Sequence, residues 1–156
     1  MVRVPPPVIA LAAVLGQRAL TGPTGRPPAA RAVLATTLVA LSGSLAGAAS
    51  RQFARRGTTI DPIHPDQASV LVTTGPNAIT RNPMYVGLAG VVVAHAVWRG
   101  SWMALLPVAG YLALIDRLQI PAEENALVGR FGPDYEAYRE TTPRWLDRRS
   151  LEAVRG

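Results

Sequence analysis

Apolar blocks separated by short polar stretches dominate the pattern of this chain. The clearest block covers residues 29–50, where Arg31 near the start is the one charged residue. Because a bilayer core is crossed by roughly 20 residues of helix, this block predicts a transmembrane helix. Residues 5–20 form a weaker apolar block, which Gln17 and Arg18 interrupt. A secretory signal peptide is an alternative interpretation of that first block.

The second half of the chain contains two further apolar blocks within residues 83–120. Only Arg99 and Gly100 separate them, and so short a connection predicts an antiparallel helical hairpin. With a first hairpin over residues 1–50, the pattern predicts about four transmembrane helices.

Polar, arginine-rich segments lie on either side of the second hairpin. They are a linker at residues 51–82 and a tail at residues 121–146. Because arginine-rich connections stay on the cytoplasmic side, the linker, the tail and both termini are predicted to be cytoplasmic. We interpret His64 as an ordinary polar residue of the linker, and we expect residues 147–156 to be frayed. The pattern therefore predicts an all-α integral membrane protein of one domain, with a helical tail that forms a pocket.

Composition supports a membrane protein and excludes several kinds of site. Hydrophobic residues make up 49% of the chain, charged residues only 17%, and the mean hydropathy is +0.18. The absence of Cys excludes disulfides and thiolate metal sites, and two His residues argue against a histidine metal site.

The net charge of +6 at first suggests nucleic acid as a partner. However, the arginines lie between the apolar blocks, where they suit anionic lipid headgroups instead. Every basic residue is Arg and none is Lys, and we attribute this to coding bias in a bacterial genome. The expected location is therefore the bacterial inner membrane.

The candidate chemistry begins where the third apolar block starts. Arg81, Asn82, Pro83 and Tyr85 lie within five positions there. The first N–H groups of a helix lack partners and attract anions, so an Arg beside them predicts an anion pocket. Asn82 and Pro83 are also common at helix starts for capping alone, and both interpretations remain open.

Two adjacent acids, Glu123 and Glu124, follow the second hairpin. An antiparallel hairpin returns its far end beside its start, so we expect both acids near Arg81. Acidic residues also suit a first helical turn without any further role. Tyr135 and Tyr138 lie three positions apart, on one helical face.

This set of residue types suits a ligand with a carboxylate, a cation, vicinal hydroxyls and an aromatic ring. A guanidinium binds carboxylates, carboxylates bind hydroxyls or cations, and aromatic rings stack or bind cations. S-adenosylmethionine carries all four groups.

The motif spacing also resembles known families. Thr73-Thr74-Gly75-Pro76, Arg81-Asn82-Pro83-Met84-Tyr85-x-Gly87, Glu123-Glu124-x-x-Leu127-x-x-x-Phe131-Gly132-x-x-Tyr135-x-x-Tyr138 and Arg144-Trp145 follow one another. This order is similar to the isoprenylcysteine carboxyl methyltransferase and phospholipid methyltransferase families, over residues 51–146. The resemblance implies an integral membrane enzyme that uses S-adenosylmethionine.

The resemblance also implies roles for individual residues. It implies a cofactor pocket formed by Arg81, Asn82, Tyr85, Glu123 and Glu124, covered by Tyr135, Tyr138 and Arg144. The families often have His where this chain has Asn82. Since an amide is no base near neutral pH, we expect Asn82 to position rather than to transfer protons.

The expected reaction is methyl transfer to a lipophilic acceptor, a carboxylate or an amine, that enters from the bilayer. We assign catalytic roles to Glu124, which would take a proton from an amine, and to Arg117, which would orient an acidic acceptor. Glu123 is an alternative base. A sterol-reductase-like enzyme that uses NADPH and a non-catalytic membrane scaffold are the alternative functions. The sequence predicts neither the oligomeric state nor the acceptor.

Overall fold

A computed structural model describes residues 4–57 and 69–155, and every regular element in these ranges is a helix. The linker residues 58–68, with His64, lie outside the described part. The helices are α1 (Pro6–Thr21), α2 (Ala29–Arg55), α3 (Pro76–Ile79), α4 (Pro83–Arg99), α5 (Leu105–Leu114), α6 (Ile120–Phe131), α7 (Pro133–Thr141) and α8 (Arg148–Arg155). A 3₁₀ turn (Trp102–Ala104) precedes α5 and a π turn (Ile115–Gln119) follows it. The all-α prediction is confirmed.

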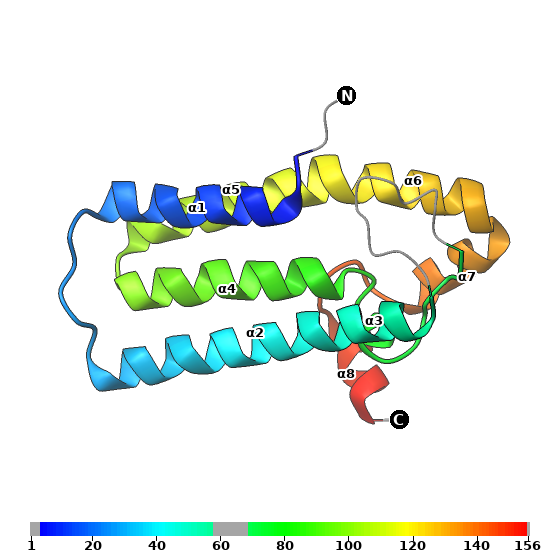
Figure 1. Cartoon of the computed structure of the whole chain (residues 1–156), viewed down its shortest axis with the longest axis horizontal. Helices are drawn as coiled ribbons and strands as arrows, with labels where there is room; N and C mark the ends of the chain where they lie inside the picture. The colour runs from blue at the N-terminus through cyan, green and yellow to red at the C-terminus, as the bar shows by residue number, and fades with distance from the viewer. Residues whose placement is uncertain (1–3, 58–68, 156) are drawn as a thin grey trace.

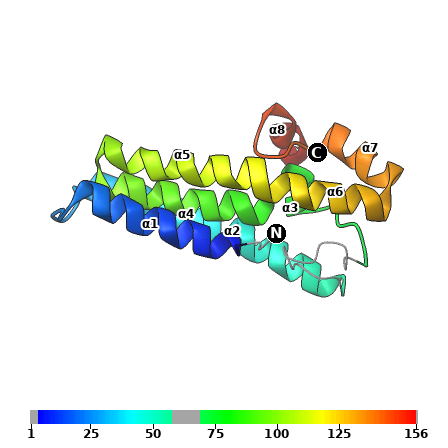
Figure 2. The same ribbon diagram turned by 90° about the horizontal axis from the view of Figure 1, so that it is seen from above.

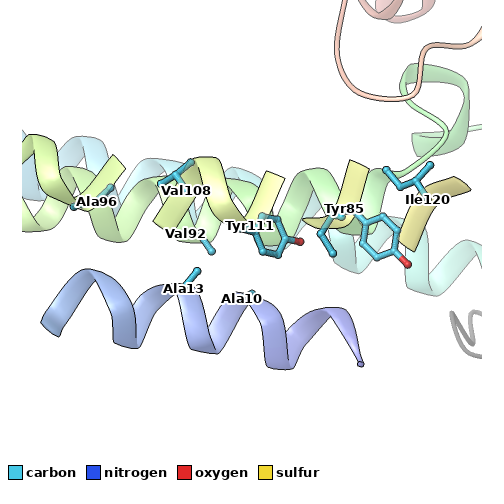
Figure 3. Close-up of a cluster of buried hydrophobic side chains, with 10 residues drawn as sticks. Ala10, Ala13, Tyr85, Val92, Ala96, Val108, Tyr111 and Ile120 are labelled. Carbon is cyan, nitrogen blue, oxygen red and sulfur yellow. The ribbon is translucent and has the colours of Figure 1, made fainter. Parts of the chain in front are cut away.

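Helix α4 is the centre of the bundle, with α2 along one side of it and α1 and α5 along the other (Figure 1). The expectation of an N-terminal hairpin needs correction here, because α1 and α2 make their main contacts with α4 rather than with each other. Figure 3 shows the apolar core between α1, α4 and α5, where Ala13 points toward Val92.

Glycines on α4 explain why α2 packs against this helix. A Cβ added at Gly87 would lie 2.9 Å from the backbone oxygen of Ser42, and one at Gly90 would lie 2.0 Å from Ser42 Oγ. Small residues allow helix backbones to approach closely, which strengthens packing in lipid. The α2–α4 contact therefore depends on the absence of side chains at these two positions.

Helices α4 and α5 pack against each other across a tight turn, but the second of these helices does not stop at residue 120. Gly100 adopts the left-handed conformation (φ 65°) that ends α4, and the chain returns along α4 as α5. The π turn then joins α5 to α6 without a break, and the Ile120 N–H bonds to the Ile115 oxygen. We expected the tail to start at residue 121, where Pro121 lies, as a segment separate from the hairpin. The shift of bonding register before this residue, which has no N–H, lets the helix continue instead.

Two helical stretches are long and apolar enough to cross a bilayer. They are α2, with 27 residues, and the continuous run Trp102–Phe131, with 30 residues. Helices α1 and α4 have 16 and 17 residues, which is short for a span. Two of the four predicted spans thus meet the criterion, and the four-span topology stays a prediction.

The C-terminal segment differs from the frayed end that we expected. Asp147 Oδ1 accepts a hydrogen bond from the Arg149 N–H at 2.8 Å, and Ser150 Oγ accepts one from the Asp147 N–H at 3.1 Å. This reciprocal pair starts α8 as a capping box does. The buried Ser150 hydroxyl also donates to the Ile79 oxygen at 2.7 Å, which fastens α8 to α3.

Candidate active site at the start of helix α4

The carboxylate of Glu124 lies between two arginines. Arg144 donates from Nη2 to Oε2 at 2.6 Å and from Nε to Oε1 at 3.2 Å. Arg81 Nη1 lies 3.0 Å from Oε1, and the side chains of Arg81 and Glu124 are 9% and 7% exposed. A buried carboxylate is costly unless it is paired, and here two positive groups provide the pairing.

Backbone contacts hold the tail against the loop before α4. The Arg81 N–H donates to the Pro143 oxygen at 2.8 Å. Thr80 Oγ1 and Asn82 Nδ2 both donate to the Arg144 oxygen, at 2.9 and 3.0 Å. Asn82 occupies the N-cap position, as expected, but its side chain makes no capping bond to α4. The amide instead fixes the tail that carries Arg144.

A second acid, Asp116 in the π turn, extends the cluster. Its Oδ1 accepts hydrogen bonds from Arg144 Nη1 at 3.1 Å and from Trp145 Nε1 at 2.9 Å. Its partner Arg144 thus joins two acids, and hydrogen bonding to Glu124 and then to Asp116 raises the pKa of this guanidinium. The tail residue Arg144 therefore stays charged and bridges the end of the hairpin to α6.

The adjacent acid Glu123 has different partners from Glu124. Its Oε1 accepts hydrogen bonds from the Tyr85 hydroxyl and from Gln119 Nε2, the latter at 2.6 Å. Tyr85 is buried in α4 and Gln119 in the π turn. Neighbouring positions on a helix point in different directions. Glu123 consequently faces the interior of the hairpin, whereas Glu124 faces the arginines.

Tyr135 and Tyr138 on α7 cover the cluster from the tail side. Both are buried, and their rings pack edge to face with centroids 6.0 Å apart. The Tyr138 hydroxyl donates to the Asn77 oxygen at 2.6 Å. Burial raises the pKa of Tyr138, and burial together with the charge of Glu124 raises the pKa of Tyr135, partly offset by Arg81. Both phenols are therefore neutral donors near pH 7.

Some buried polar atoms of the cluster have no hydrogen-bond partner within the described residues. Nε and Nη1 of Arg81 are such donors, since the contact with Glu124 lacks hydrogen-bond geometry, and Asn77 Oδ1 is such an acceptor. Buried polar groups are nearly always paired, so these atoms need an explanation. Free donors on a guanidinium and a free acceptor suit a ligand that carries both an anion and an N–H group.

An open groove of about 720 Å³ lies beside the cluster, between α4 and α5. Most of its lining is apolar, from Val86, Ala89, Gly90, Val93, Leu112 and Ala113. At its polar end lie Asp116, Arg117, Trp145 and Leu146. Arg117 is exposed and has no hydrogen-bond or ion-pair partner in the part of the chain that is described.

The structure thus brings together most of the residues that the sequence suggested. Arg81, Glu124 and Arg144 form the charged centre, with Asn82, Tyr135 and Tyr138 around it. Tyr85 and Glu123 form a neighbouring pair, and Arg117 lies apart, at the groove.

Two contributing residues, Asp116 and Asn77, were missing from our predicted site, and Trp145 was noted only within the Arg144-Trp145 motif. For Asp116 a signal existed, because an acid at a membrane exit is costly unless it is paired. Asn77 is placed by the tertiary structure alone.

Comparison with known sequences assigns the family. The family model described as phospholipid methyltransferase matches residues 30–134, which cover α2 to α6 and the first residues of α7. The chain belongs to this family. It is therefore a member of a family of membrane methyltransferases, and the match includes Arg81, Glu123 and Glu124.

Two curated relatives match parts of the chain. An uncharacterized protein of Haemophilus influenzae is 35% identical over 63 residues, which are 40% of this chain and all of that protein. The nickel-cobalt-cadmium resistance protein NccN of Alcaligenes xylosoxydans xylosoxydans is 34% identical over 89 residues, 54% of this chain and 39% of NccN. No solved structure matches the chain significantly.

Proposed function

We propose that the protein transfers a methyl group from S-adenosylmethionine to a lipophilic acceptor that enters sideways from the bilayer. The observation that carries this proposal is the Arg81–Glu124–Arg144 cluster at the start of α4, with Glu124 and Arg81 buried, beside an open apolar groove. Membership of a methyltransferase family favours this function over an NADPH reductase or a scaffold.

The residues of the cluster fit the amino-acid end of this cofactor. The Arg81 donors that make no hydrogen bond suit its carboxylate, and the Asn77 oxygen that accepts none suits its ammonium group. Glu124 pairs with both arginines and keeps Arg81 in place, and Asp116 supplies the second negative charge at Arg144. Tyr135 and Tyr138 supply aromatic faces that cover the site without adding charge.

When bound, S-adenosylmethionine would supply an electrophilic methyl group, and its sulfur would leave as a neutral thioether. The protein then contributes alignment and exclusion of water rather than acid–base chemistry for a carboxylate acceptor. An amine acceptor must also lose a proton. Glu124 is held on both oxygens by guanidinium groups, so we assign the proton acceptor role to Glu123 in that case, contrary to our initial assignment.

The groove suits the acceptor because its walls are apolar and its end is charged. An acyl or prenyl chain would lie against Val86, Ala89 and Val93. The unpaired guanidinium of Arg117 at the end would orient an acidic head toward the cluster, with Asp116 and Trp145 at its side.

The proposal is tested with purified protein in nanodiscs and S-adenosylmethionine that carries a labelled methyl group. We expect label in the lipid extract, and a higher melting temperature with S-adenosylmethionine than with NADPH, because only the former suits the cluster. Stabilisation by NADPH alone would favour the reductase. Neither stabilisation nor labelling of any lipid pool would contradict the proposed function.

A further inference from the structure

Helix α8 exposes its largest apolar side chains. Leu151 and Val154 are 62% and 66% exposed, and they lie three positions apart, on one face of the helix. Arg148 and Arg155 lie three positions before and four positions after Leu151, along the edge of this apolar face, whereas Glu152 lies on the side of the helix away from Val154. An apolar face bordered by arginines is typical of helices at a boundary between apolar and aqueous phases.

The exposure of this face does not come from a loosely attached helix. Ser150 holds α8 to α3 through the Ile79 oxygen, and Arg149 Nη1 donates to the Glu140 oxygen of α7 at 3.0 Å. Arg149 also pairs with Asp147 at 2.7 Å. Two elements of the body therefore fix α8 in an orientation that leaves Leu151 and Val154 uncovered.

The position of α8 corresponds to the level at which the bundle helices begin. Its contact residue Ile79 ends α3, and α4 starts four residues later at Pro83. Figure 1 shows α8 beside α3 at this end of the bundle, and Figure 2 shows it off to one side of the bundle axis. An amphipathic helix at this level lies where headgroups of the surrounding leaflet would be.

The excess of basic residues near α8 indicates that the helix suits an anionic lipid surface. The chain carries 16 basic and 10 acidic residues, and Arg55 and Arg56 at the end of α2 lie at the same end of the bundle as α3. Basic residues beside apolar ones attract anionic lipid headgroups. Leu146, 57% exposed, lines the acceptor groove and precedes α8, so apolar surface occurs at both places.

A second copy of the chain is a less suitable occupant. Two large apolar side chains on one short helix, with Leu146 before it, form a patch far smaller than the roughly 800 Å² that each partner buries in a stable interface. A lipid surface needs no such area, because it adds to the anchoring of the bundle itself.

We propose that α8 is an interfacial helix that inserts Leu151 and Val154 among the anionic headgroups of the membrane that holds the bundle. Arg148 and Arg155 contact the lipid phosphates. Since Trp145 and Leu146 lead into α8 and line the groove, the docked helix also fixes the wall at the polar end of the groove.

The chain has no Cys, so a single introduced Cys gives one labelled position. We would label Leu151→Cys with a fluorophore that reports polarity, and reconstitute the full chain in vesicles of phosphatidylcholine with phosphatidylglycerol. Glu152→Cys, on the opposite face, is the matched control, and Val154→Cys repeats the test on the apolar face.

At Leu151 and Val154 we expect blue-shifted emission, several-fold stronger quenching by headgroup spin-labelled lipid than at Glu152, and protection from aqueous iodide. The lipid quenching should decrease when phosphatidylglycerol is omitted, and also in Leu151→Cys chains that carry Arg148→Gln and Arg155→Gln. Equal iodide quenching at all three positions would overturn the proposal. So would protection that disappears when the protein is diluted with excess lipid, since that result indicates a second copy.

Discussion

Two buried polar clusters lie at opposite ends of α4, and they differ in how completely they are satisfied. At the far end, the fully buried Gln17 donates from Nε2 to the oxygens of Val92 and Ala104, at 3.0 and 2.9 Å. Its Oε1 lies 2.6 Å from His95 Nδ1. This cluster joins α1, α4 and the start of α5 with no polar atom of Gln17 left over.

The cluster at the start of α4 differs in its charge and in its hydrogen bonding. It is charged, with Glu124 between Arg81 and Arg144, and it contains buried atoms without a partner among the described residues. A satisfied neutral network fixes a fold, whereas unpaired donors in a charged network are available to a ligand. The comparison therefore supports a structural role for the Gln17 cluster and the proposed ligand-binding role for the Glu124 cluster.

The largest effect that we predict is on activity, from Glu124→Gln. The amide keeps the shape but removes the charge that holds Arg81 and Arg144, so we expect a loss of about 10²-fold in methyl transfer, as for misplaced catalytic groups. Weaker binding of S-adenosylmethionine, measured by calorimetry, should accompany it. Glu140→Gln, exposed on α7, is the control. A Glu124→Gln protein that turns over normally would contradict the site.

For Gln17→Leu we expect a loss of stability with activity kept. Removal of the amide leaves the backbone oxygens of Val92 and Ala104 without the hydrogen bonds from Gln17 Nε2. This loss costs about 1–3 kcal/mol in stability. The melting temperature, followed by intrinsic Trp fluorescence, should fall. Activity per folded molecule and cofactor affinity should stay at the wild-type level. If cofactor affinity fell as well, the Gln17 cluster would affect ligand binding, and the contrast between the two clusters would be wrong.

A smaller effect, confined to the acceptor, is expected for Arg117→Gln. This exposed guanidinium lies at the groove and outside the Glu124 cluster. For an acidic acceptor, loss of one charge-assisted contact should raise the acceptor KM by about tenfold, equivalent to ~1.4 kcal/mol. The affinity for S-adenosylmethionine should not change. Arg26→Gln, exposed in the turn before α2, provides the comparison, and an equal change in both variants would exclude a local role.

The smallest effect is expected for Tyr138→Phe. The ring and its contact with Tyr135 remain, but the hydrogen bond to the Asn77 oxygen is lost, at a cost of about 1 kcal/mol. Stability and cofactor affinity should both decrease slightly. No change in either property would mean that α7 does not hold the loop before α4.

Much of this architecture could be predicted because it depends on local sequence. Apolar blocks of helical length mark α1, α2, α4 and α5, and Arg99-Gly100 leaves room only for a tight turn. The spacing of Arg81, Glu123 and Glu124 around that hairpin then brought acid and arginine to one end, and the family match bears out the resemblance.

Only the tertiary structure decided the features that depend on contacts between residues far apart in the sequence. Gln17 interrupts an apolar block in the sequence, yet it is a buried connection to residues 75 and 87 positions away. Only the folded chain separates Glu124, paired with arginines, from Glu123, paired with Tyr85. Only there does Asn82 bind the tail rather than cap its helix. Local periodicity determines where helices form, but the partner of a buried polar group depends on which helices meet.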